Sequence, residues 1–186
     1  MKISVVLALF FVTMIHIRPE KPEDIASIEN VTTRAFQGEE EANLIAAIRT
    51  SDYFIPELSL VALDDNTQTV GHILFSPVKI ESPETSVEAL ALAPMAVLTE
   101  CQNSGIGTLL VQHGLAACKK LGYSIVIVVG HPEYYPRFGF RPARDCGIKA
   151  PFEVPDEAFM VLELVPGALK NVRGVVKYSP PFDSAI

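Results

Sequence analysis

The chain has 186 residues, of which 49% are hydrophobic, so it can bury one substantial core but is too short for two domains of ordinary size. Its formal net charge is −7 and its lysines and arginines are scattered, which argues against nucleic acid as a partner because phosphate binding needs a concentrated basic surface. Three separated cysteines and four scattered histidines offer neither a CxxC pair nor zinc-ligand spacing. We therefore expect free thiols, a reducing compartment and no metal.

The first fourteen residues are unusually apolar. Lys2 followed by ISVVLALFFVTM has the charged start and apolar stretch of a signal peptide. The stretch is shorter than the ~20 residues that a membrane-spanning helix needs, and no small-residue cleavage site follows it. We therefore interpret residues 1–14 as an extension from an upstream start and residues 15–186 as a single cytoplasmic domain that binds no membrane. A membrane anchor is the competing interpretation.

The patterns of apolar residues predict alternating strands and helices along the rest of the chain. Helical spacing and apolar runs favour, in order, a short strand from 17, helices to 36 and at 39–50, a hairpin over 58–80, a strand at 86–97, a helix at 105–121, a strand at 124–130, a short helix or turn at 131–137, and strands at 158–164 and 173–178. This order indicates an α/β layer with a mixed sheet.

Pro94 lies inside the predicted strand at 86–97. A proline has no N–H to donate to a neighbouring strand, so it belongs at an edge, a bulge or a point where pairing stops. We therefore expect the sheet to be irregular there.

A glycine-containing turn follows that strand and opens the helix at 105–121. Residues 102–107 read Gln-Asn-Ser-Gly-Ile-Gly. A helix start offers unpartnered N–H groups and a positive dipole end, and glycines let an anion approach this backbone closely. A merely tight bend is equally compatible with these glycines. The spacing excludes a P-loop, and it excludes the dinucleotide fingerprint because Leu110 occupies the third glycine position.

The stretch from Val97 to Gly130 resembles the acetyl-CoA-binding core of the GNAT superfamily of N-acetyltransferases. Its signature of Gln or Arg, two residues, Gly, one residue, then Gly or Ala is matched by Gln102, Gly105 and Gly107. Downstream, YYPRFGFRPA carries the family's tyrosine followed four residues later by Gly-Phe. The element order agrees over residues 15–178, while the specific motifs lie within 89–143.

This resemblance implies a mixed, mostly antiparallel sheet of six to seven strands, with a bulge or splay between the fourth and fifth strands and helices on both faces. It also implies acetyl-CoA as co-substrate, bound by backbone groups in two segments. The backbone of Met95, Ala96 and Val97 would bind the pantetheine amides. The pyrophosphate would be wrapped by Gln102, Asn103, Ser104, Gly105, Ile106, Gly107 and Thr108.

The resemblance also assigns a role to Tyr135, the tyrosine of the Tyr-x-x-x-Gly-Phe motif, as the acid that protonates the leaving thiolate. Its hydroxyl is protonated at neutral pH, as that role requires. Tyr134 is the alternative acid, and a packing role for both tyrosines is the third possibility. The general base stays open among Glu88, His131 and Glu133.

Other polar residues have ordinary structural explanations. We expect His113 to lie in the core, because it falls on an apolar stripe of its helix. Cys101 suggests an acyl-enzyme nucleophile but has no evident base partner. Arg137, Arg141 and Arg144 could meet a CoA phosphate, although isolated arginines are usually solvated.

The overall expectation is direct acetyl transfer in a ternary complex to a primary amine, namely a small molecule, a peptide N-terminus or a lysine. Residues 150–164 would close the acceptor side. A non-catalytic acyl-CoA-binding or sensing domain is the alternative function, and the chain would act as a monomer or homodimer.

Overall fold

The computed structural model describes residues 14–184. The helices are α1 (Ile25–Phe36), α2 (Glu40–Arg49) and α3 (Ile106–Lys120). The strands are β1 (His16–Pro19), β2 (Ser59–Leu63), β3 (Thr69–Glu81), β4 (Ser86–Val97), β5 (Ile125–Val129), β6 (Arg141–Pro142), β7 (Ile148–Lys149), β8 (Phe159–Glu163) and β9 (Gly174–Lys177). Apart from Met14, the predicted N-terminal extension lies outside the described residues.

The strands form one mixed sheet in the order β1-β2-β3-β4-β5-β8-β6, and β9 pairs with β3 and β7. All pairs are antiparallel except β4–β5 and β7–β9. The expected mixed, mostly antiparallel sheet is therefore confirmed. Over residues 14–184 it has nine strands instead of six to seven. The difference arises from β6 and β7, which have two residues each and so produce no detectable alternation in the sequence.

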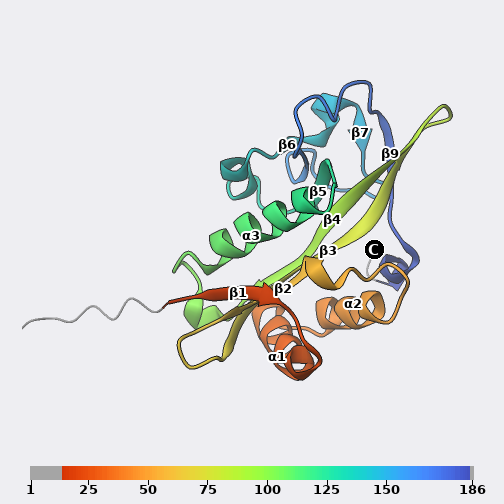
Figure 1. Ribbon diagram of the computed structural model, residues 1–186. Helices are drawn as coiled ribbons and strands as arrows, with labels where there is room; N and C mark the ends of the chain where they lie inside the picture. Colours follow the sequence, from red (N-terminus) through yellow and green to blue (C-terminus); the bar gives the residue numbers. More distant parts are fainter. Residues whose placement is uncertain (1–13, 185–186) are drawn as a thin grey trace, which may run out of the picture.

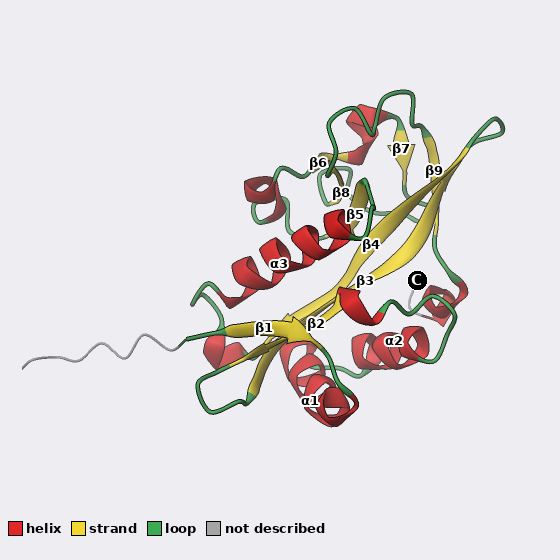
Figure 2. Ribbon diagram, viewed as in Figure 1, coloured by secondary structure: helices red, strands yellow, loops and turns green. Residues whose placement is uncertain are grey.

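Helices cover both faces of this sheet, as expected: α1 and α2 lie on one face and α3 on the other (Figures 1 and 2). β5 shows why its sequence is a continuous apolar run. Ile125 and Ile127 join the core beneath α1 and α2, whereas Val126 and Val128 join the core beneath α3. Successive side chains of a strand point to opposite faces, so a strand covered twice must be apolar throughout.

Helix α3 does not bury His113, and the expectation of a core histidine is wrong. The helix buries Ile106, Leu110, Gly114 and Cys118, which are spaced by four residues, and His113 is exposed beside this line. Gly114 allows the close approach: a Cβ there would lie 2.3 Å from the Phe75 ring.

The sheet is irregular at Pro94, as its sequence position predicts. Ile73 pairs with Met95 and Phe75 with Leu92, so two steps along β3 span three along β4, and β4 bulges between these pairs. On its other side, β4 pairs with β5 only from Leu90 to Leu92. Beyond the bulge, β4 therefore leaves β5 and follows β3 alone.

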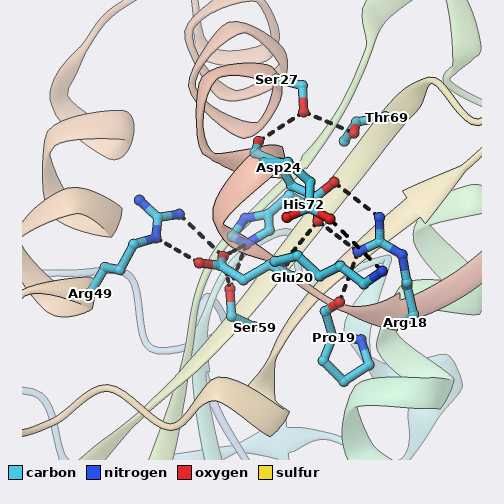
Figure 3. Close-up of polar contacts among 11 residues, drawn as sticks. Arg18, Pro19, Glu20, Asp24, Ser27, Arg49, Ser59, Thr69 and His72 are labelled. Carbon is cyan, nitrogen blue, oxygen red and sulfur yellow. Dashed lines mark hydrogen bonds and ion pairs between the residues drawn. The ribbon is translucent and has the colours of Figure 1, made fainter.

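A buried polar network joins β1, β2, β3 and α2 (Figure 3). Glu20, directly after β1, accepts a hydrogen bond from Arg49 Nε at 2.6 Å and another from the Ser59 hydroxyl. His72 Nε2 lies 2.8 Å from Ser59 Oγ and 3.4 Å from Glu20 Oε2. Because Ser59 and His72 are completely buried, this Ser–His–Glu group has no access to a substrate.

Within residues 14–184, no helix combines the length and apolar character needed to cross a membrane.

Candidate active site

A cavity of about 1220 Å³ opens where β4 and β5 separate. Its walls come from the bulged part of β4, the end of β5, the start of α3 and the 3₁₀ helix η4 (Tyr135–Phe138). The structure brings most of the predicted site residues to this cavity. They are Met95, Val97, Gln102, Asn103, Gly105, Ile106, Gly107, Thr108 and Tyr135.

Two predicted site residues, Ala96 and Ser104, do not line the cavity. Ala96 pairs with His72, and its side chain is buried. The prediction for Ala96 concerned its backbone, and it stays a prediction. Ser104 is exposed, and its hydroxyl donates to the carbonyl of Cys101, so it holds the turn together.

The glycine turn is held in one geometry at the head of α3. Gln102 Nε2 donates to the carbonyl of Val97 at 3.1 Å, which ties the turn to the end of β4. Asn103 and Gly105 have positive φ angles of 59° and 89°. A Cβ on Gly105 would meet nothing within 4 Å. Glycine is therefore favoured here by the positive φ angle and not by a shortage of space.

Gly107, in contrast, has a side chain close to it. A Cβ on Gly107 would lie 2.8 Å from the Tyr134 hydroxyl, which therefore rests against the first turn of α3. Arg137 covers the Tyr134 ring at 4.5 Å and lines the same cavity. The first-turn N–H groups of α3 have no acceptor within the helix, so this corner combines unpartnered donors, a positive dipole end and a guanidinium. Such a corner suits an anion.

Tyr135 lies deeper in the cavity wall. Its ring is only 6% exposed and makes edge contacts with Tyr134 and Phe140 at 5.2 and 5.6 Å between centroids. A Cβ on Gly130 would lie 2.2 Å from this ring, so the glycine that ends the β5 run makes room for it. Burial raises the pKa of Tyr135, which keeps the phenol protonated. Among the described residues its hydroxyl has no hydrogen-bond partner, which leaves its proton available to a ligand in the cavity.

The cavity is also lined by a second group of residues, which lie before and after the predicted site residues in the sequence. They are Phe36, Glu40, Glu41, Leu44, Phe152, Glu153, Tyr178 and Phe182. Phe152 and Glu153 belong to the segment that the sequence placed on the acceptor side. The other six were missed, because only long-range packing brings α1, α2 and the C-terminal 3₁₀ helix η6 (Pro180–Ser184) to this place.

A protein-family model described as an acetyltransferase (GNAT) domain matches residues 16–143, more than half of the chain. The chain belongs to the GNAT superfamily. It is 33% identical over 167 residues to YhbS of Escherichia coli K12, an uncharacterised N-acetyltransferase, covering 90% of this chain and 98% of that protein. A second uncharacterised N-acetyltransferase of E. coli K12, YjhQ, is 39% identical over 135 residues, covering 72% and 74%. The chain is thus an N-acetyltransferase.

Solved GNAT structures agree with this fold. The crystal structure of E. coli YhbS in complex with CoA has a TM-score of 0.83 and 31% identity, with 92% of each chain covered. A GNAT acetyltransferase of Brucella melitensis, crystallised with acetyl-CoA, has a TM-score of 0.74 and 32% identity, covering 91% of this chain and 99% of that one.

The sequence left three candidates for the general base of the reaction. The structure places His131 in the cavity wall, whereas Glu88 and Glu133 do not line it. Cys101 also lines the cavity, but burial raises the pKa of its thiol and the nearby carboxylates of Glu100 and Asp64 act in the same direction. A thiol with a raised pKa forms little thiolate, which argues against an acyl-enzyme on Cys101.

The other arginines lie away from the cavity, and the described residues form no metal site. Of the three arginines considered, only Arg137 lines the cavity, and Arg144 pairs with Asp156 on the surface. Within residues 14–184, no group of three His, Cys, Asp or Glu residues could hold a metal ion.

Proposed function

We propose that this GNAT protein transfers the acetyl group of acetyl-CoA to a primary amine by direct attack in a ternary complex. One observation carries the proposal: a single cavity joins the anion-suited corner at α3, the part of β4 that has left β5, and Tyr135. The CoA and acetyl-CoA complexes of the YhbS and Brucella structures support the choice of donor.

In the proposed complex, backbone groups carry most of the recognition of the donor. The pyrophosphate binds at residues 102–108, where N–H groups and the helix dipole favour negative charge. Arg137 adds a guanidinium that can reach a phosphate. The pantetheine arm lies along Met95–Val97, where the backbone groups of β4 are not paired with β5.

The proposed chemistry follows from that placement. The neutral amine attacks the thioester carbonyl, a C–N bond forms, the C–S bond breaks, and the thiolate takes the proton of the Tyr135 hydroxyl. The acceptor is an ammonium in solution, so it loses one proton to become the neutral amine before the attack and a second proton as the amide forms. The first proton goes to solvent. His131 is the base candidate that lines the cavity, so we assign the second proton to it.

Calorimetry with acetyl-CoA tests the donor site. Gly107→Glu places a carboxylate and a side chain in the anion corner, where a Cβ already meets the Tyr134 hydroxyl at 2.8 Å. We expect the Kd for acetyl-CoA to rise by at least about tenfold, or 1.4 kcal/mol. Gln112→Glu is the matched control, because it adds the same charge on an exposed position of α3.

Equal affinities of wild type and Gly107→Glu, with both proteins folded by thermal unfolding, would show that the turn does not bind the pyrophosphate. Release of CoA in the presence of an amine, detected with a thiol reagent, separates transfer from a binding or sensing role.

A further inference from the structure

The cavity has two chemically different halves. The donor half is formed by its lining residues between 91 and 137, and the acceptor half by those in 36–44 and 152–182. Among the lining residues that the structure describes, the donor half contains Arg137 and no carboxylate, whereas the acceptor half contains Glu40, Glu41 and Glu153 and neither lysine nor arginine. This opposite charge predicts that the two bound molecules differ in sign.

An aromatic wall lines the acceptor half. The rings of Phe152 and Tyr178 lie 5.8 Å apart between centroids at 38°, and those of Tyr178 and Phe182 lie 5.0 Å apart at 54°. Phe36, at the end of α1, is 42% exposed although large and apolar, and it borders the same space. Such a wall offers ring faces and edges to a planar apolar group.

The three glutamates of the acceptor half come from two different segments of the chain. Glu40 and Glu41 lie in the first turn of α2, where a helix dipole alone would favour them. Glu153 is not on a helix and approaches from the segment between β7 and β8, so the dipole does not explain it. Among the described residues none of the three carboxylates has an ion pair or hydrogen bond, unlike Glu20 and Asp24.

We propose that the acceptor is an arylalkylamine: a primary ammonium on a short alkyl arm attached to an aromatic ring. The ring packs on Phe152 and Tyr178, while the buried Phe182 supports Tyr178 from the core. The carboxylates attract the cation and exclude acceptors that carry their own carboxylate. A polyamine would satisfy the acids but leave the aromatic wall without a partner. This assignment rests on the proposed acetyl transfer and names its substrate class.

A panel of four amines tests the assignment. Phenethylamine, n-butylamine, spermidine and phenylalanine are compared by CoA release at saturating acetyl-CoA. Phenethylamine is also titrated calorimetrically into protein saturated with CoA, so that binding is measured without turnover. We expect kcat/KM for phenethylamine to exceed that for each of the other three by at least about fivefold, in line with the contribution of an aromatic contact.

Two sets of variants assign the effect to the two features. Glu40→Gln with Glu41→Gln, and separately Glu153→Gln, should raise the KM for phenethylamine about three- to fivefold, as exposed charges do, and leave the Kd for acetyl-CoA unchanged. Glu57→Gln, an exposed glutamate outside the cavity, is the control. Phe152→Leu should reduce the preference for phenethylamine over n-butylamine, whereas Tyr53→Leu, outside the cavity, should not.

The outcomes separate this assignment from the proposed function. A turnover of spermidine, n-butylamine or phenylalanine equal to that of phenethylamine would overturn the arylalkylamine assignment. So would binding of acetyl-CoA without binding or acetylation of phenethylamine, although the donor site would then stand. If acetyl-CoA itself does not bind, the proposed function fails and the acceptor assignment falls with it.

Discussion

Two adjacent tyrosines occupy different environments in the cavity wall. Tyr134 places its hydroxyl against Gly107 at the head of α3, beneath the guanidinium of Arg137. Tyr135 buries its ring against Gly130 and Phe140, and its pKa is raised by burial. One residue therefore faces the corner suited to phosphate, and the other offers a protonated phenol deeper in the cavity. A single-atom change can separate their roles.

Tyr135→Phe removes the proposed acid and keeps the buried ring. We expect kcat to fall by at least about 100-fold, the usual contribution of a positioned acid, while the Kd for acetyl-CoA stays the same. Initial rates of CoA release and calorimetry provide the two measurements. Tyr134→Phe is the matched variant, and it should keep most of kcat; an unchanged kcat in Tyr135→Phe would exclude this phenol as the acid.

At the scale of elements, the packing of α3 on β3 depends on one glycine. In an open helix, Gly→Ala adds up to about 1 kcal/mol of stability. At Gly114, however, the new Cβ would lie 2.3 and 2.7 Å from two atoms of the Phe75 ring, and overpacking of a core costs about 1–3 kcal/mol. The clash outweighs the gain in helix propensity.

We therefore expect Gly114→Ala to lower the free energy of unfolding by about 1–2 kcal/mol, measured by urea denaturation. Gly38→Ala is the control, since a Cβ there meets nothing within 4 Å. A Gly114→Ala protein as stable as wild type would mean that Phe75 repacks without cost.

Elements with a clear period were predictable from the sequence. The helix predicted from 105 to 121 runs from Ile106 to Lys120, and the strand predicted over 86–97 is β4. Pro94 indicated the bulge because a proline lacks the N–H that strand pairing needs, and this loss of pairing occurs at the proline itself. β6 and β7 were missed because two residues cannot show alternation.

The site was predictable only where it is local in sequence. The glycine turn and the tyrosine pair come from one stretch of chain, and a motif could reveal them. The apolar stripe did not fix which neighbouring positions of the helix face the core, and His113 lies just outside the buried line. The prediction that His113 is buried was therefore wrong. No local sequence motif marks Phe36, Glu40 and Phe182 as site residues, because only the fold brings them to the cavity.

At the scale of the whole molecule, the Glu20 network couples stability to pH. Burial alone raises the pKa of Glu20, but hydrogen bonds from His72, Arg49 and Ser59 outweigh it and bring the pKa from 4.5 to about 2. Burial lowers the pKa of His72 below 6.5, and this effect exceeds the opposite pull of Glu20. In both cases the unfolded chain takes up its proton first as the pH falls, so acid favours unfolding.

We expect the free energy of unfolding to fall as the pH drops below 6.5, where unfolded His72 is protonated, and again from 4.5 toward about 2 through Glu20. Glu20→Gln should lose about 2 kcal/mol at pH 7 and show a flatter dependence in the lower window. Urea denaturation at a series of pH values measures both.

Glu100→Gln is the control for this prediction, because Glu100 pairs with Arg34 on the surface, where ion pairs contribute little. Parallel curves for wild type and Glu20→Gln would mean that Glu20 does not cause the acid sensitivity.

The two halves of the cavity are also separate in the gene. The donor half is encoded by one contiguous stretch, residues 91–137, whereas the acceptor half is assembled from the flanks, 36–44 and 152–182. Substitution or recombination in the flanks can therefore alter the choice of acceptor while the central stretch passes unchanged from ancestor to descendant. With this arrangement, proteins that descend from one ancestor can keep the same donor site while they differ in the acceptor that they bind.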